Sequence, residues 1–253
     1  MTPLVCMMTR NRWYRSGSTI PMTGIVLHST GANNPQLRRY VQPTPGDERY
    51  EGLLEALGTN VNQNDWNREG QDYGMHAFVG KLADGTVAAV QTLPWDSFLW
   101  GCGCGRNGSY NSSHIQIEIC EDTTDADYTK QAYWAAAELC AHLCKLFSIP
   151  VERIVSHHEA ALAGYADTHA DPEHWWGRFG CSMAGFREDV QRLLDGGQEE
   201  AARYNRPEEI PVWAQGTIQK LLRSGILQGD GAGLDLSRDM LRLLVLLDRA
   251  GQF

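Results

Sequence analysis

Four of the chain's eight histidines lie within residues 154–176, together with four carboxylate side chains. Imidazole and carboxylate groups are suitable zinc ligands, and they are also common groups in acid–base catalysis. The stretch therefore predicts a metal site or an acid–base site. It holds more donors than one ion can bind, so residues elsewhere must decide which ones are used. The donors are His157, His158, His169, His174, Glu159, Asp167, Asp171 and Glu173.

Two predicted strands can bring further donors to this stretch. Residues 24–30 form a short apolar run that includes His28, as expected of a buried strand whose end reaches a site. Residues 115–119 alternate isoleucine with polar residues, so Gln116 and Glu118 share one face of a second strand, which either meets solvent or lines a cleft. A hydrolytic zinc site needs three protein ligands and one position for water. His28, the histidine cluster and the nearby Glu118 can together supply such a site.

Several short segments match the motifs of one known family, in the same order along the chain. They resemble the zinc-dependent N-acetylmuramoyl-L-alanine amidases of the type 2 family, which includes bacteriophage lysozyme-type amidases and is related to peptidoglycan recognition proteins. The resemblance covers about residues 20–190. The segments are Ile-Val-Leu-His-Ser-Thr at 25–30, Gly-Met-His-Ala-Phe at 74–78, Ile-Gln-Ile-Glu at 115–118, Ser-His-His-Glu at 156–159 and His-Ala-Asp at 169–171.

The resemblance implies a role for each of five residues. One zinc ion would be held by His28, His157 and Asp171, and Glu118 would act as general base and pass the proton to the leaving amine. His169 stands where the family has lysine, and would stabilise the oxyanion of the tetrahedral intermediate. The amide cleaved would join the lactyl group of N-acetylmuramic acid to L-alanine of the peptidoglycan stem peptide.

Two of the ligand assignments have alternatives. Neighbours in an extended strand point to opposite sides, so His157 and His158 cannot easily both bind one ion. If His169 were the third ligand, Asp171 would instead orient its ring. The motifs favour His157 and Asp171, and leave His158 as a core residue or an outer contact.

Three residues are expected to contact the substrate, namely His76, Trp100 and Asn111. His76 lies in a predicted hairpin and has the equal alternative of a hydrogen-bonded residue behind the site. A tryptophan-histidine pair common in the family reads Trp100-Gly101 here, so that histidine is absent. Gln116 replaces a glycine of the family motif and is expected to narrow the cleft.

The other histidines and the tryptophan pair have simpler interpretations. We expect His114, His142 and His174 at the surface or at helix ends. Trp175 and Trp176 are expected in the core, with a sugar or peptide platform as the alternative.

The predicted fold class of the first part of the chain is mixed α/β, with a central sheet flanked by helices. Asp84-Gly85 favours a tight hairpin turn between two strands. The pattern from 127 to 147 has apolar residues every three or four positions, which is typical of a helix. Predicted strands are 24–30, 75–79, 86–90 and 115–119, and predicted helices are 51–57, 127–147 and 186–194.

A small helical module is predicted after a polar connector. Helices over 211–222 and 237–250 bury little core alone, so this module is expected to dock on the first domain, pair with a copy of itself or bind an external partner. A weak likeness to half of a surface-layer-homology repeat favours cell-wall binding, whereas the apolar run 241–247 favours a homodimer through these helices. The predicted boundaries are a zinc amidase domain at 1–194, a linker at 195–206 and the module at 207–253.

Composition narrows the partners and the setting. The net charge of −9 and the lack of a Lys/Arg block argue against nucleic acid and anionic membranes. We see no signal peptide and no apolar stretch of about 18 residues, so the chain is expected to be made in the cytoplasm without membrane insertion. The family resemblance implies peptidoglycan as the partner, and together with the lack of a signal peptide it favours a phage or prophage endolysin that reaches the wall through a phage-encoded pore. Seven irregularly spaced cysteines favour free thiols.

Two other functions compete with this one. A non-catalytic wall-recognition module is disfavoured because all three expected metal ligands are present. A cytoplasmic amidase that recycles soluble muropeptides is disfavoured by the C-terminal module, since a small soluble substrate needs no wall anchor.

Overall fold

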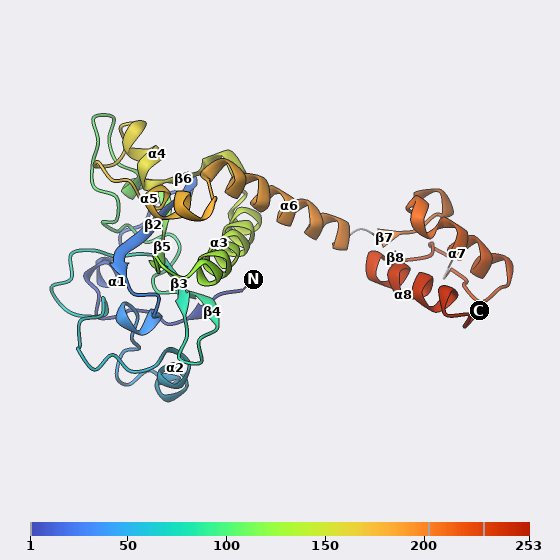
Figure 1. Cartoon of the computed structure of the whole chain (residues 1–253), viewed down its shortest axis with the longest axis horizontal. Coiled ribbons are helices and arrows are strands. Elements are labelled where there is room, and N and C mark those ends of the chain that lie inside the picture. Colours follow the sequence, from blue (N-terminus) through green and yellow to red (C-terminus); the bar gives the residue numbers. More distant parts are fainter. Residues whose placement is uncertain (1, 202, 230) are drawn as a thin grey trace. The chain divides into compact units, whose positions relative to one another are not determined.

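A computed structural model describes residues 2–201, 203–229 and 231–253, with only the backbone described for 197–201. The chain forms two compact units, Met1–Gln191 and Arg192–Phe253. Helix α6 (Met183–Ala201) runs across this boundary and into the linker that we predicted for residues 195–206 (Figure 1). Two glycines at 196 and 197 misled the prediction. Each costs a helix about 1 kcal/mol relative to alanine, which a 19-residue helix can tolerate.

The first unit is built on one six-stranded sheet with the order β1-β4-β3-β5-β2-β6. All neighbouring strands are parallel except the β3–β4 hairpin. This arrangement confirms the predicted mixed α/β class. The strands are β1 (Leu4–Val5), β2 (Gly24–Asn33), β3 (Ala77–Lys81), β4 (Val87–Gln91), β5 (His114–Glu121) and β6 (Ile154–Ser156).

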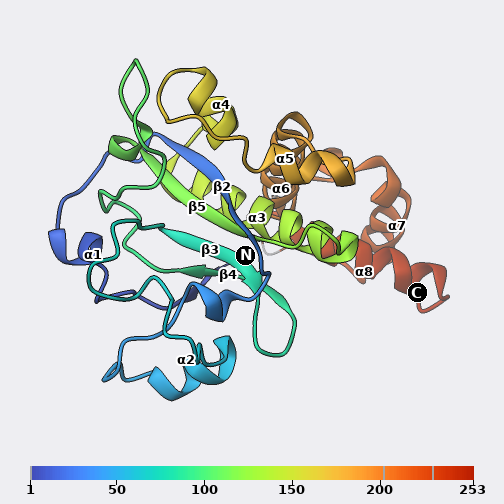
Figure 2. The same cartoon turned by 60° about the vertical axis from the view of Figure 1, so that its left-hand side comes forward.

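Helices cover both faces of this sheet, with α3 (Ala126–Phe147) along one face (Figure 2). On the other face, Phe78, Val90 and Cys120 pack into one cluster with residues of α2 (Tyr50–Leu57). The remaining helical segments of this unit are short. They are α1 (Arg12–Ser16), η1 (Leu37–Arg39), η2 (Tyr110–Ser112), η3 (Val151–Arg153), α4 (His157–Leu162), α5 (Glu173–Trp176) and η4 (Gly177–Phe179).

The alternation in β5 sorts its side chains between these two faces. Cys120 lies in the cluster with α2, so Gln116 and Glu118 share its face, while Ile115, Ile117 and Ile119 point to the face covered by α3. All eight residues of β5 are buried. Glu118 therefore does not face solvent, which was one of its two predicted environments.

The second unit has its own small apolar core. The helices α7 (Val212–Arg223) and α8 (Arg238–Arg249) pack together, and Ser237 caps α8 by accepting a hydrogen bond from the Met240 N–H. A two-stranded ribbon, β7 (Arg203–Tyr204) with β8 (Leu236–Ser237), and the turn η5 (Pro207–Glu209) complete the unit. None of the described helices is long and apolar enough to cross a membrane.

Candidate metal centre

His28 lies inside β2 and is 2% exposed. It is paired in register with Glu118 of β5, so both side chains point to the same face of the sheet. We predicted His28 at the end of a strand, but β2 continues to Asn33. The residues after His28 are mostly polar, so their sequence did not indicate a strand. They nevertheless continue β2, with a shift in its pairing to β5 after Ser29.

His157 is placed next to His28 by the pairing of β6 with β2. Leu27 pairs with Ser156, so the next residue of each segment, His28 and His157, come together. His157 opens α4, where Ser156 and Glu159 form a capping box that fixes the start of the helix. The prediction had His157 in an extended strand. Instead, the strand β6 ends at Ser156, and the capping box begins the helix at His157.

His158 does not face the centre. Its Nδ1–H donates to the main-chain oxygen of His169 at 3.1 Å, and its main-chain N–H donates to that of Asp171 at 3.2 Å. His158 thus ties the segment that carries Asp171 to the start of α4. This contact matches the outer role that was one alternative for His158.

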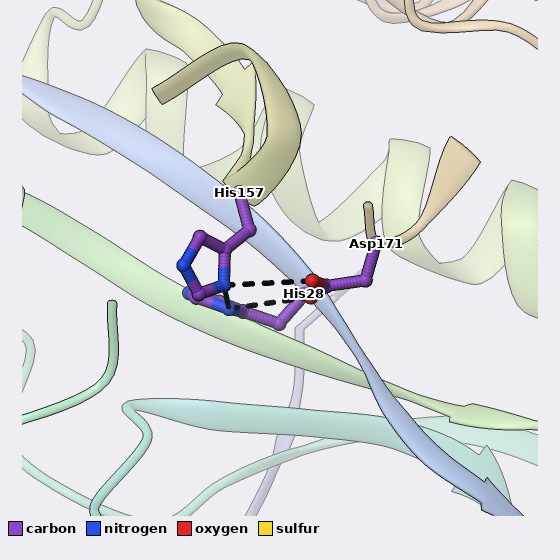
Figure 3. Close-up of side chains that lie close together, drawn as sticks. All are labelled: His28, His157 and Asp171. Carbon is purple, nitrogen blue, oxygen red and sulfur yellow. Dashed lines mark hydrogen bonds and ion pairs between the residues drawn. The ribbon is translucent and has the colours of Figure 1, made fainter. Parts of the chain in front are cut away.

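Asp171 completes a buried group of three, shown in Figure 3. Its carboxylate oxygens lie 3.5 Å from Nδ1 of His28 and 3.5 Å from Nδ1 of His157. The Ser29 N–H donates to Oδ2 at 3.2 Å and fixes the carboxylate. The buried Oδ1 accepts no hydrogen bond from any residue that the structure describes. A buried carboxylate oxygen that accepts no hydrogen bond is costly unless a cation binds it.

The two histidine rings turn the same atom toward each other. Nδ1 of His28 and Nδ1 of His157 are 3.0 Å apart. On the outer side, Nε2 of His28 is 2.6 Å from Oε1 of Gln116, and Nε2 of His157 is 2.9 Å from Oδ1 of Asp167. Both outer nitrogens therefore donate, and in neutral rings both Nδ1 atoms carry lone pairs. Two facing lone pairs and a carboxylate fit a divalent metal such as zinc.

Charge in the centre is set by burial and by close contacts. Burial opposes ionisation of Asp171, but when the His157 and His28 rings carry a hydrogen at Nδ1, their contacts outweigh burial and lower the pKa of its carboxyl. Burial also disfavours charge on His157, yet Asp171 and Asp167 raise its pKa. Burial, helped by Asp171 and Glu121, raises the pKa of Glu118 well above its ordinary value.

Glu118 lies against the same cavity as the three candidate ligands. The cavity has a volume of about 590 Å³, and Glu118 is 6% exposed. Its carboxyl group has no hydrogen bond to any of the described residues, so it is free to bind a water molecule or a substrate group. A carboxyl group with a raised pKa in a cleft is a functional-site signal.

His169 lies at the outer edge of the cavity, and its side chain is 53% exposed. Its ring stacks on that of His157 with centroids 4.3 Å apart and 7° between the planes. Its Nδ1 is 3.4 Å from Asp171, and its Nε2 is 3.8 Å from Asp167. The group of His28, His157 and Asp171 is the buried one, whereas His169 and Asp167 form a more exposed group with the other side of His157.

Of the three predicted substrate contacts, Trp100 lines the cavity, together with Trp66 and Tyr73. His76 and Asn111 do not. His76 is fully buried, with Nδ1 accepting from the Gln116 N–H and Nε2 donating to the Ser97 oxygen. It therefore follows the alternative of a hydrogen-bonded residue behind the site.

Asn111 lies beneath the glycine-rich loop and is 1% exposed. Its Oδ1 accepts from the N–H groups of Gly101 and Cys102, and its Nδ2 donates to the Gly103 oxygen. All of its polar atoms are used to hold the loop. A direct contact with substrate is therefore not supported.

Of the remaining histidines, His174 is where we expected it and His114 is not. His174 is exposed in the short helix α5, and it also lines the cavity, with its Nε2 3.1 Å from the buried carboxylate of Glu121. His114 is 1% exposed and stacks on Tyr110 at 3.8 Å, so it is not a surface residue. Trp175 and Trp176 are fully buried, as expected for the core.

Sequence reasoning missed the contacts of Gln116 and Asp167 with the histidine rings. The alternation of side chains along β5 could have indicated the contact of Gln116, because Gln116 and Glu118 lie on the same face of the strand. Asp167 gave no comparable signal, since it lies in an irregular segment.

The chain is similar to known amidases. A family model described as N-acetylmuramoyl-L-alanine amidase matches residues 18–174. The amidase CwlA of a Bacillus species is 32% identical over 71 residues, 28% of each chain. The amidase CwlH of Bacillus subtilis (strain 168) is 32% identical over 128 residues, 46% of this chain and 49% of CwlH. The chain thus matches about half or less of the length of these relatives.

Solved structures resemble the chain at low identity. A mutant of PlyL matches at 20% identity and a TM-score of 0.49, over 76% of this chain and 99% of PlyL. The hydrolase AmiA of Staphylococcus aureus matches at 20% identity and a TM-score of 0.47, over 78% of this chain and 82% of AmiA. The family model spans most of the first unit and includes every residue of the candidate centre. The chain belongs to the N-acetylmuramoyl-L-alanine amidase family.

Proposed function

We propose that this chain is a zinc-dependent peptidoglycan amidase that cleaves the bond between N-acetylmuramic acid and L-alanine of the stem peptide. One observation carries the proposal. A buried group of three side chains turns its ligand atoms toward one point, and Glu118, which has no hydrogen bond among the described residues, lines the same cavity. The three are His28, His157 and Asp171. Family membership supports the identity of the bond.

His28, His157 and Asp171 are the proposed ligands of one zinc ion. Two imidazoles and one carboxylate leave a position for water, as in other hydrolytic zinc sites. When bound there, zinc supplies Lewis acidity, which brings the pKa of water toward neutrality and polarises a carbonyl group. The alternative third ligand, His169, is less well supported because it is half exposed and faces the opposite side of His157.

Glu118 is the proposed general base. Its carboxylate would take a proton from the attacking water and give it to the leaving amine nitrogen of L-alanine. Its position supports this role because it opens to the cavity and has no competing hydrogen bond among the described residues. Its raised pKa suits a group that must both accept and release a proton.

His169 is the proposed stabiliser of the developing oxyanion. Its ring lines the cavity and is half exposed, so a ring N–H can reach a bound carbonyl oxygen. Stacking on His157 and the adjacent Asp171 limit its rotation. Lysine at this position would offer a mobile ammonium group, whereas His169 offers a fixed planar donor.

The proposed setting is degradation of the bacterial cell wall by a phage or prophage enzyme made in the cytoplasm. The second unit would either bind the wall or pair two chains. Among its residues, Leu243 and Leu246 of α8 are more than half exposed, which supports a contact surface of one kind or the other.

The test is hydrolysis of purified cell walls by metal-free protein and by the same protein reloaded with zinc. We expect new L-alanine amino groups to appear only after zinc is restored, with no new reducing ends from the sugar chain. Wall binding without amide cleavage in the zinc-loaded protein would instead indicate a recognition module.

A further inference from the structure

Gln116 contacts the candidate centre without being one of the proposed ligands. Gln116 is fully buried, and its side chain reaches His28. Its Oε1 is 2.6 Å from Nε2 of His28. Gln116 does not line the cavity, so our expectation that it narrows the cleft is wrong.

The contact selects one tautomer of His28. An amide oxygen can only accept, so Nε2 of His28 must carry the hydrogen. Nδ1 of the neutral ring is then left with its lone pair, and this is the atom that faces His157 and Asp171. Without the acceptor, a neutral imidazole would divide between two tautomers, and only one of them can bind a metal through Nδ1.

The orientation of the Gln116 amide is itself fixed. Its Nε2 donates to the thiol sulfur of Cys102 at 3.6 Å, so the oxygen is turned toward His28. Gly101 passes close to it: a Cβ at Gly101 would lie 3.1 Å from Oε1 of Gln116. The main-chain N–H of Gln116 donates to His76, which secures the strand at this residue.

Cys102 connects this amide to the acceptor of the other histidine. The Asp167 N–H donates to the main-chain oxygen of Cys102 at 3.0 Å, and Oδ1 of Asp167 accepts from Nε2 of His157. Asn111 holds Cys102 in turn, with Oδ1 accepting from its N–H at 2.9 Å. One buried loop residue thus touches both groups that orient the two histidine rings.

We propose that Gln116 is a positioning residue that presets His28 for metal binding, and that Cys102 holds Gln116 and Asp167 in a common frame. This inference rests on the proposed function because it concerns the same centre. It adds that the ligand geometry exists before metal arrives, through side chains that touch neither metal nor substrate.

The test is zinc affinity of the full chain, measured by competition with a chromogenic chelator. Gln116→Met keeps the volume but removes the acceptor, and should weaken zinc binding by about 10- to 100-fold, as for other groups that orient metal ligands. Gln116→Glu keeps an acceptor and should restore most of the affinity. Cys102→Ala loses the sulfur contact but keeps its main-chain bond to Asp167, so it should weaken binding less than Gln116→Met.

Gln91→Met is the matched control. Gln91 is also a buried glutamine of the sheet, and its Nε2 donates to the Leu93 oxygen, away from the centre. Equal zinc affinity in Gln116→Met and Gln91→Met would overturn the inference, even if the wild-type protein hydrolyses walls. Weaker binding in Gln116→Met alone would support it, even if no amide were cleaved.

A second measurement does not depend on zinc or on activity. Side-chain ¹⁵N spectra of the metal-free chain distinguish the two histidine tautomers. We expect His28 to be protonated at Nε2 in the wild type and in Gln91→Met, and to be mixed in Gln116→Met. An unchanged His28 spectrum in Gln116→Met would contradict the positioning role.

Discussion

The two compact units of this chain bury different kinds of side chain. The first unit buries histidines, carboxylates and amides, some of which line its cavity. The second has an apolar core, in which Thr217 is the single buried polar side chain among its described residues. The apolar core consists of Ile210, Ala214, Ile218, Leu236, Leu241 and Val245.

The first unit buries the groups proposed for catalysis, whereas the second unit buries almost only apolar side chains. A buried polar group costs free energy unless it is bonded, and a buried charge costs more. In the first unit, buried polar groups hold the proposed ligands and base in place. The packing of α3 against the sheet offsets the free energy that their burial costs. The second unit gains stability from packing alone. Substitutions in the first unit's cavity should therefore change turnover, and those in the second unit's core should change only stability.

The largest expected effect is on turnover. Glu118→Gln removes the proposed base and should lower kcat by about 10²- to 10⁴-fold, while zinc remains bound because Glu118 is not a proposed ligand. Thermal stability should not fall, since the variant no longer buries an ionisable group. Hydrolysis rates, zinc content and melting temperature of the same preparation measure all three.

A buried carboxylate far from the cavity serves as the control. Asp189 is 8% exposed and accepts a hydrogen bond from the Tyr133 hydroxyl at 2.6 Å. Asp189→Asn should lose stability but keep its turnover. A Glu118→Gln enzyme with full turnover would remove Glu118 from the mechanism and leave the metal site without a base.

The second prediction concerns the apolar core of the second unit. Leu241 is fully buried there, so Leu241→Ala should destabilise this unit by about 2–5 kcal/mol. Leu243, two residues along α8, is 57% exposed, and Leu243→Ala should change stability by less than about 0.5 kcal/mol. Hydrogen exchange of the α7 and α8 amides measures this unit directly. Equal exchange in the two variants would show that Leu241 is not a core residue.

The third prediction is a difference in acid sensitivity, because all eight histidines belong to the first unit. Burial lowers the pKa of His76 to about 4 and that of His114 to about 3. In the unfolded chain both would titrate near 6.5, so between these values the unfolded state binds more protons. The contribution of His76 and His114 to the stability of the first unit should therefore fall as pH decreases below about 6.5, by up to about 1.4 kcal/mol per pH unit for each histidine.

Replacing one of these residues isolates its contribution. His114→Phe keeps a ring to stack on Tyr110 but cannot take up a proton. The metal-free variant should lose less stability than the wild type between pH 6.5 and pH 5, measured by denaturant unfolding. Parallel pH dependence of the two proteins would show that His114 does not remain neutral on acidification. The second unit has no histidine and should not respond in this window.

Local residue patterns and motif spacing were enough to predict strands, the faces of their side chains and the family. The alternation in residues 115–119 indicated a strand and put Gln116 and Glu118 on one face, and the apolar runs indicated the strands that carry His28 and the hairpin. The family is confirmed by the match over residues 18–174. The assignment of His28, His157 and Asp171 as ligands and Glu118 as base stays a prediction.

What the sequence could not predict depends on contacts between distant segments. The Gln116 amide meets His28 only because β5 and β2 pair in one register, and a shift by one residue would turn it to the other face. Asn111 was assigned to the substrate, but the loop it holds folds back over it. The contact of His174 with Glu121 was not predicted either, because the two residues lie far apart in the sequence. Buried polar partners follow from tertiary packing, which periodicity does not encode.

The smallest expected effect tests whether the two units act separately. Leu246 of α8 is 62% exposed, and Leu246→Glu places a charge on the apolar outer surface of that helix. We expect turnover of a soluble muropeptide to stay unchanged, while either sedimentation with cell walls or self-association decreases. Loss of wall sedimentation would favour anchoring, and a change from dimer to monomer would favour assembly. A fall in soluble turnover would instead mean that the second unit supports the centre, and that chemistry and packing are not divided between the two units.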